Sequence, residues 1–244
     1  MHVGAALGEP GCLAHHRVDV AFALALLARR VARTLGAGLP MTTALIIFAK
    51  APVAGLAKTR LIPALGTQGA AALAEKLLDH AVSQALATDC AHLELCVTPD
   101  ATHATFERLL SQAKGRLCLS MQGEGDLGQR MDRALTRCLQ THGRALLMGT
   151  DAPCLNAEVL KAADQALANQ DAVFVPALDG GYALVGLTRP EPRLFANMRW
   201  STPRVMAESR ARAKHSDLRW VELAPIADID EPPDLVHLSS GWLV

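Results

Sequence analysis

The feature that most constrains this chain is a regular alternation of short apolar runs with longer helical segments from residue 44 onward. Short runs rich in β-branched and aromatic residues predict buried strands, whereas longer segments with apolar residues along one face predict helices. Strands that alternate with helices form a mostly parallel sheet covered on both faces, so we expect a three-layer α/β/α fold. The predicted strands are residues 44–49, 92–98, 116–121, 144–149, 172–176, 182–187 and 218–223, and the predicted helices are 68–87, 102–113, 127–140, 156–169, 203–214 and 232–238.

The length and the first forty residues bear on the domain organisation. A chain of 244 residues fits one large α/β domain or two small ones. We expect residues 41–244 to form the α/β domain and residues 1–40 to form an irregular or short-helical extension. Met41 stands just before the first predicted strand, so translation in the cell is hypothesised to begin there. The apolar run at 20–28 is about half of the ~18–20 residues that a bilayer span needs.

Charge and cysteine usage exclude several classes of partner. The 24 basic and 24 acidic residues give a formal net charge of zero, which provides no overall field for nucleic acid or an anionic membrane. The six cysteines show no CxxC or Cys/His zinc spacing and are expected to be free thiols in a reducing compartment. We therefore expect a cytoplasmic protein whose partners are small molecules.

The loop after the first strand gathers three cations, Lys50, Lys58 and Arg60, around the flexible Gly55. It matches neither a P-loop nor GxGxxG. In parallel sheets, ligands bind beyond the carboxyl ends of the strands, and backbone N–H groups with cations at such a place suit a pyrophosphate. The alternative is a solvated basic loop.

Two acidic segments suggest a metal site. Asp151 follows the predicted strand 144–149, where a carboxylate is placed to hold Mg²⁺ or Mn²⁺ together with phosphate oxygens; alternatively, it begins an Asx turn before Pro153. Asp228 and Asp230 lie on the same side of an extended segment, and one of them can complete a site with Asp151. Asp234 or Glu231 is expected to interact with the N-terminus of the closing helix.

A turn between two strands is the next candidate. In Asp179-Gly180-Gly181-Tyr182, Asp-Gly is a hairpin signal, but paired glycines also let the backbone approach a ligand closely. Asp179 can then hydrogen-bond a sugar hydroxyl or act as a base.

Two further residues have weaker signals. Arg130 stands in the first turn of a predicted helix, a natural anion site, although it is also one turn away from Asp126 and can pair with it. Trp200 can stack on a substrate ring or simply pack in the core.

Together these loops resemble a known family. The order FAKAPVAGLAKTRL, QGEGDLGQRM, GTDAP, DGGYALVGL, WST and DIDEPPDL resembles bacterial GT-A-fold glycosyltransferase-like proteins, some of them labelled as arsenosugar-biosynthesis-type glycosyltransferases. The resemblance covers residues 44–238 and implies a fold of the nucleotide-diphospho-sugar transferase type. The loops also look like those of phospholactate and molybdenum-cofactor guanylyltransferases. That likeness implies Asp151 and Asp230 as metal ligands, with Lys58 and Arg60 facing phosphates. The first loop lacks the GxGxR pattern of sugar nucleotidylyltransferases.

These observations lead to a hypothesis of metal-assisted transfer from a nucleotide donor to a small-molecule acceptor. Asp179 and Lys58 are the expected catalytic residues, and Lys50, Gly55, Lys58, Arg60 and Arg130 are expected to bind the nucleotide and its phosphates. Gly180, Gly181, Tyr182 and Trp200 would shape the sugar or acceptor pocket. Three alternatives stay open: a glycosyltransferase, which the family resemblance favours; a nucleotidylyltransferase, which the basic loop favours because pyrophosphate carries away more charge; and a non-catalytic nucleotide-binding protein.

Overall fold

The computed structural model describes residues 41–242, and the expected extension at 1–40 lies outside the described residues. In the described part, a seven-stranded sheet has the order β3-β2-β1-β4-β6-β5-β7. The strands are β1 (Thr43–Lys50), β2 (His92–Thr98), β3 (Leu117–Met121), β4 (Arg144–Met148), β5 (Ala172–Pro176), β6 (Tyr182–Leu187) and β7 (Trp220–Glu222). All seven predicted strands are present.

The sheet is parallel except for β6, which runs antiparallel to both of its neighbours. The antiparallel β5–β6 pair follows from the turn at Asp179-Gly180, the hairpin signal noted in the sequence. The chain adds β2 and β3 on one side of β1 and then crosses to β4 on the other side. β1 and β4 therefore border a topological switch point, where ligands bind in sheets of this type.

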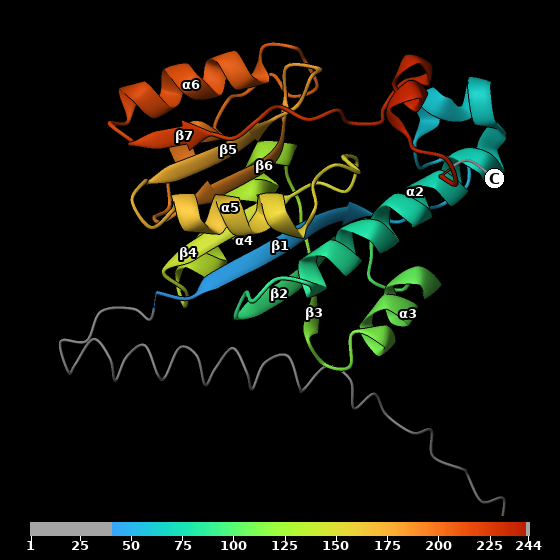
Figure 1. Ribbon diagram of the computed structural model, residues 1–244, viewed down its shortest axis with the longest axis horizontal. Coiled ribbons are helices and arrows are strands. Elements are labelled where there is room, and N and C mark those ends of the chain that lie inside the picture. The colour runs from blue at the N-terminus through green and yellow to red at the C-terminus, as the bar shows by residue number, and fades with distance from the viewer. Residues whose placement is uncertain (1–40, 243–244) are drawn as a thin grey trace, which may run out of the picture. The chain divides into compact units, whose positions relative to one another are not determined.

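Helices cover both faces of the sheet, which confirms the three-layer prediction (Figure 1). One core packs α2, α3 and α5 against side chains such as Leu45, Ile47 and Leu95. The other core packs α4 and α6 against alternate positions such as Ile46 and Leu147. The helices are α2 (Ile62–Leu86), α3 (Ala104–Gln112), α4 (Leu127–Leu139), α5 (Ala157–Ala166) and α6 (Val205–His215), with 3-10 turns η1 (Thr59–Leu61), η2 (Pro192–Leu194) and η3 (Pro232–His237).

Two helical predictions differ in detail from the structure. α2 as a whole begins at Ile62, but Gly66 inside it has φ 69° and ψ 169°, so two helical segments meet there at a kink, and the helix predicted over 68–87 is the longer segment that follows. Gly66 adopts a positive φ that other residues avoid. The closing helix over 232–238 is a short 3-10 helix, η3, over Pro232–His237, and a capping box between Glu231 and Asp234 closes its first turn.

A third apolar cluster ties the C-terminal segment to η1 and α2. Ile229, which is fully buried, packs with Leu61 and Leu73 of the η1–α2 region. Farther along the chain, Leu235 and Trp242 pack against the same cluster. This packing brings a segment near residue 230 beside the loop that follows β1, and it positions the site described next.

Candidate active site

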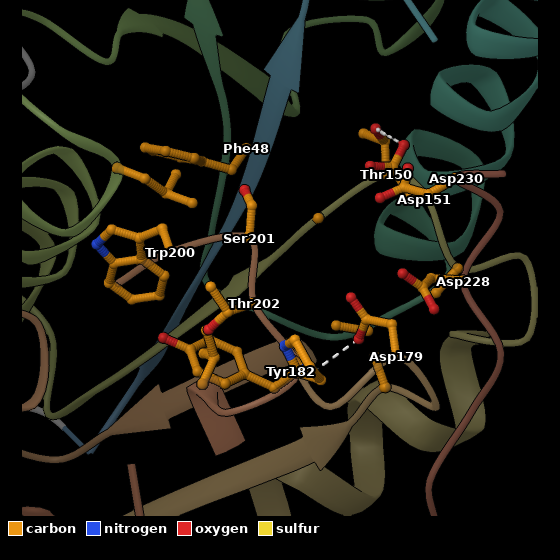
Figure 2. A pocket seen from close by; sticks show the side chains of 18 of the residues that line it. Phe48, Thr150, Asp151, Asp179, Tyr182, Trp200, Ser201, Thr202, Asp228 and Asp230 are labelled. Atoms are coloured by element: carbon orange, nitrogen blue, oxygen red, sulfur yellow. Dashed lines mark hydrogen bonds between the residues drawn. The ribbon is translucent and has the colours of Figure 1, made fainter. Parts of the chain in front are cut away.

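A cavity of about 630 Å³ opens at the carboxyl edge of the parallel strands. Its walls come from the end of β1, the loop after β4, the β5–β6 turn, the start of α4, the segment before α6 and the acidic segment near residue 230. Figure 2 shows two ends of this cavity, one lined by carboxylates and the other by aromatic rings. We call them the acidic end and the aromatic end.

The acidic end is organised around Lys58. Its ammonium Nζ lies 2.6 Å from an oxygen of Asp151 and 2.8 Å from an oxygen of Asp230, and it also donates to the backbone oxygen of Ile229 at 2.5 Å. The Lys58 side chain is 8% exposed, whereas the two carboxylates are 46% and 40% exposed. One buried cation thus holds together two carboxylates that come from segments far apart in the sequence. We call Asp151 and Asp230 the carboxylate pair.

Backbone contacts fix this arrangement. The Ile229 N–H donates to the Asp151 carbonyl at 2.9 Å, which fastens the acidic segment to the loop after β4. Lys58 itself has φ 47° and ψ 44°, a left-handed conformation that non-glycine residues adopt rarely. Such strain persists only where the surrounding structure imposes it and is common at functional sites.

Two groups at the acidic end, Lys58 and Asp228, have shifted pKa values, and the causes of the two shifts differ. Burial alone would lower the pKa of Lys58, but the charges and hydrogen bonds of Asp151 and Asp230 outweigh it and raise the pKa above its ordinary value. Burial raises the pKa of Asp228 to about 6, and the negative charges of Asp179, Asp230 and Asp234 contribute in the same direction. The acidic end therefore carries more negative charge than its cations neutralise.

The carboxylate pair fits a divalent cation in its donor chemistry. Two carboxylates are the protein ligands that Mg²⁺ and Mn²⁺ commonly take alongside phosphate oxygens. Both carboxylates already converge on one point, and the Lys58 ammonium lies at that point. A metal ion at that same point would take the place of the Lys58 ammonium.

A second group with metal-ligand chemistry lies elsewhere. His92, Glu94 and Cys138 bring potential ligand atoms together near the start of β2, at the opposite edge of the sheet from the cavity. Glu94 is almost fully buried, and Arg137 contacts both of its oxygens, at 2.7 and 2.6 Å. Because its oxygens are already engaged by a cation, this cluster is a buried ion pair, and the negative charge of Glu94 needs no metal ion.

The aromatic end is formed by Phe48, Tyr182 and Trp200, with Leu127 and Met131 behind them. Tyr182 and Trp200 meet edge to face, with ring centroids 6.4 Å apart at 85°. The indole also lies against Gly128 so closely that a Cβ there would come within 2.9 Å of it. Burial raises the pKa of Tyr182, which stays neutral. These residues give the cavity one apolar wall.

The Asp179 turn borders both ends. The Asp179 carboxylate accepts a hydrogen bond from the Gly181 N–H at 2.7 Å, and Gly180 has φ 91° (Figure 2). A Cβ at Gly180 would meet the Pro203 carbonyl oxygen at 2.3 Å, so only glycine allows this close approach. The turn is thereby docked on the segment that carries Trp200 to the cavity.

The candidate residues of the loop after β1 lie in different surroundings. Arg60 lines the cavity at its rim, 59% exposed, with its guanidinium 3.7 Å from Glu231. Lys50 is exposed and donates to the Leu56 carbonyl at 2.8 Å, and Gly55 takes a φ of 80° in the turn between them. Neither Lys50 nor Gly55 is among the described residues that line the cavity.

Arg130 also lies outside the lining residues of the described part. Its guanidinium donates to the Gln122 side chain at 3.1 Å and to the Asp126 carbonyl at 3.3 Å. The Asp126 carboxylate instead accepts from the Gln129 N–H in a capping box at the start of α4. Arg130 thus supports the loop before α4, and its proposed contact with phosphate stays a prediction.

The structure brings most of the predicted site residues to one cavity. The predicted residues that line the cavity are Arg60, Asp151, Asp179, Gly181, Tyr182, Trp200 and Asp230, with Lys58 directly behind the carboxylate pair. Sequence reasoning did not select Phe48, Thr150, Ser201 or Thr202, which also line it. Ser201 had one available signal, because it directly follows Trp200 in the WST motif; Phe48 looked only like a core strand residue.

Residues 80–202, half of the chain, match the family model DUF2064, described as an uncharacterized protein conserved in bacteria. No curated protein matches.

Several solved structures are similar. A protein of Desulfovibrio desulfuricans G20, provisionally assigned as a nucleotide-diphospho-sugar transferase, is 27% identical, with a TM-score of 0.73 over 82% of this chain and 89% of that one. The 4-diphosphocytidyl-2C-methyl-D-erythritol synthase of Anaerococcus prevotii DSM 20548 is 12% identical, with a TM-score of 0.57 over 80% and 93% of the chains. A cytidylyltransferase of Leptospira borgpetersenii is 14% identical, with a TM-score of 0.52 over 82% and 89%.

The last two similarities, at low identity, show the fold alone. Together with the similarity to the D. desulfuricans protein, they confirm the prediction of a nucleotide-diphospho-sugar transferase type of fold. No described helix is long and apolar enough to cross a membrane. With half of its length matched by the family model, the chain belongs to the DUF2064 family of bacterial proteins.

Proposed function

We propose that this protein is a metal-dependent glycosyltransferase that uses a nucleotide-diphospho-sugar donor and a small-molecule acceptor. The observation that carries the proposal is the convergence of Asp151 and Asp230 on one cation position beside a cavity of about 630 Å³. This position lies at the switch-point edge of the sheet, where nucleotide ligands bind in open α/β folds. The similarity to the D. desulfuricans protein supports a nucleotide-sugar donor. Membership of the arsenosugar-biosynthesis type of glycosyltransferase is the narrower form of the proposal.

Each residue takes a role that its place allows. A Mg²⁺ or Mn²⁺ ion held by the carboxylate pair would offset the charge that develops on the leaving nucleoside diphosphate. Lys58, released from the pair, and Arg60 at the rim would contact the donor phosphates. Lys50 and Gly55 of the same loop, and Arg130 in the first turn of α4, are proposed to extend this contact. Asp179 would bind or deprotonate the acceptor hydroxyl.

The apolar wall of the cavity favours glycosyl transfer. Aromatic faces suit the C–H face of a sugar ring, and Trp200 and Tyr182 provide such faces close to Asp179. Gly180 and Gly181 let the turn lie close to a ring bound there. A nucleotidylyltransferase is the second candidate, because Lys58 and Arg60 place two cations beside the carboxylate pair, as a triphosphate would need.

The proposal is tested by donor binding and by the product released. Thermal unfolding with Mn²⁺ across a panel of nucleoside triphosphates, diphosphates and nucleotide-sugars should show stabilisation by one nucleotide-sugar and its diphosphate. A ligand present at 100 times its dissociation constant adds about 2.7 kcal/mol of stability. Asp151→Asn and Asp230→Asn should each abolish the metal-dependent part of this shift, whereas the matched control Asp171→Asn, at the far edge of the sheet, should keep it.

The outcomes separate the candidates. Release of nucleoside diphosphate from a nucleotide-sugar establishes glycosyl transfer, and release of pyrophosphate from a triphosphate establishes nucleotidyl transfer. Stabilisation without either product would leave a nucleotide-binding protein. No stabilisation by any nucleotide would refute the proposal.

A further inference from the structure

The cavity that would hold the acceptor has an uneven charge. Six carboxylates line it, from Asp151, Asp179, Asp228, Asp230, Glu231 and Asp234. Arg60 is the only cationic side chain among the described lining residues, and Lys58 lies just behind them. These two cations are already engaged, Lys58 by the carboxylate pair and Arg60 by Glu231.

Three of the six carboxylates, those of Asp179, Asp228 and Asp234, pair with no described cation. The Asp234 carboxylate instead accepts hydrogen bonds from the backbone N–H groups of Asp230 and Glu231, which leaves Asp179 and Asp228. Within residues 41–242, no Lys, Arg or His lies within ion-pair distance of either. In the described part of the chain, the Asp179 carboxylate is held by the Gly181 N–H, and both side chains border the cavity (Figure 2). We call these two residues the free acidic pair.

The wall across from the free acidic pair is aromatic and hydroxylated. Figure 2 shows Ser201 and Thr202 between the aromatic end and Asp179. An aromatic face attracts a cation or a C–H surface and repels an anion. This wall therefore favours a cationic or neutral ligand over an anionic one, as the carboxylates do. Ser201 and Thr202 add hydroxyl groups that can pair with polar groups of a ligand.

We propose that the acceptor is a hydroxyl-bearing ring compound that carries an amine or no charge, and that this cavity rejects carboxylate and phosphate acceptors. The inference rests on the proposed function, because only a transferase has an acceptor, and it deepens that function by naming the chemical class of the acceptor. An anionic acceptor entering this cavity would meet the free acidic pair with no described cation available to bind its charge. Burying an unpaired charge near like charges is among the costliest arrangements in a binding site.

The test measures binding of three matched pyranoses, glucosamine, glucose and glucuronate, to the full chain by saturation-transfer NMR without donor or metal ion. The three share a ring and differ chiefly in charge. We expect glucosamine to bind more tightly than glucose, and glucuronate to bind at least about tenfold more weakly than glucosamine, with the difference shrinking in high salt. Binding of glucuronate as tight as that of glucosamine would overturn the inference, as would no binding of any of the three at millimolar concentration.

Two variants test which residues discriminate. The double variant Asp179→Asn with Asp228→Asn should bind the three sugars about equally, because it removes both free charges and keeps similar side-chain volumes. Trp200→Ala should weaken all three while keeping their order. Unchanged selectivity in the double variant would refute the role of the free acidic pair.

This experiment and the donor experiment fail independently. Sugar binding is measured without nucleotide, so a protein that binds no donor can still show the charge order. Conversely, donor-dependent stabilisation together with tight glucuronate binding would keep the proposed function and remove only the acceptor class.

Discussion

Replacing Asp228 by Asn should make this protein more stable at neutral pH, because the native fold holds the carboxylate where its charge is unfavourable. Burial is the largest cause and raises the pKa of Asp228 from 3.8 to about 6; the nearby carboxylates of Asp179, Asp230 and Asp234 add to the effect. Asparagine keeps the shape of the side chain and removes the charge.

The sign and size follow from linkage between protonation and folding. Below a pH of 3.8 the Asp228 carboxyl is protonated in both states and its shifted pKa has no effect on stability. As the pH rises from 3.8 to about 6, the group ionises in the unfolded chain first, so the native state loses stability, and above about 6 the full cost is present. A difference of roughly two pKa units corresponds to about 3 kcal/mol, and contact with water lowers the expected gain to about 1–3 kcal/mol.

Urea unfolding followed by tryptophan fluorescence, with EDTA present, measures the gain. Near pH 7.5 Asp228→Asn should exceed the wild type by that amount, and the gap should close toward pH 4. Asp171→Asn is the matched control: hydrogen bonds from Arg219 lower the pKa of Asp171, so this variant should lose a little stability at neutral pH. The reasoning is falsified if Asp228→Asn gains nothing near pH 7.5, or if its gain does not change with pH.

Three other substitutions test the packing and charges of the structure. Lys58→Met should lower the free energy of unfolding in EDTA by about 1–3 kcal/mol, because it leaves the carboxylate pair unneutralised. Mn²⁺ should stabilise this variant against thermal unfolding more than it stabilises the wild type, and equal stabilisation would contradict a cation position shared by Lys58 and the metal ion. Gly180→Ala should lower the free energy of unfolding by about 1–3 kcal/mol, because the added Cβ clashes with Pro203. The control Gly115→Ala has a similar φ but open space around it and should cost about 1 kcal/mol. Urea unfolding midpoints compare the two variants, and equal losses would exclude the clash. Glu94→Gln should cost about 3 kcal/mol by the same urea assay, because it leaves a cation without its buried partner, and a loss below about 0.5 kcal/mol would contradict that pairing.

The sequence by itself determined the layers of the fold and the edge of the sheet where the site lies. Apolar periodicity is a local property, so β1, β2 and β4 could be read from a few residues each. Parallel strands end at a common edge, and for this reason Asp151, which follows β4, could be placed beside the loop that follows β1. The Asp-Gly turn likewise predicted the β5–β6 hairpin from four residues.

Only the tertiary structure decided which charges meet. Lys58 and Asp230 are 172 residues apart, and their contact depends on the packing of Ile229 against Leu61, which no local pattern encodes. The loop cations therefore looked alike in the sequence, although Lys58 is buried between two carboxylates and Lys50 is exposed. For a related reason, the sequence did not show that Phe48 lines the cavity.

In β1, the alternation that places Phe48 on the α4 side of the sheet is the same alternation that builds the core. Whether such a side chain meets another helix or an open cavity depends on where α4 and the Trp200 segment stop, and that is fixed by contacts between distant parts of the chain. Local patterns set the strands, whereas long-range packing set the cavity and its excess of negative charge.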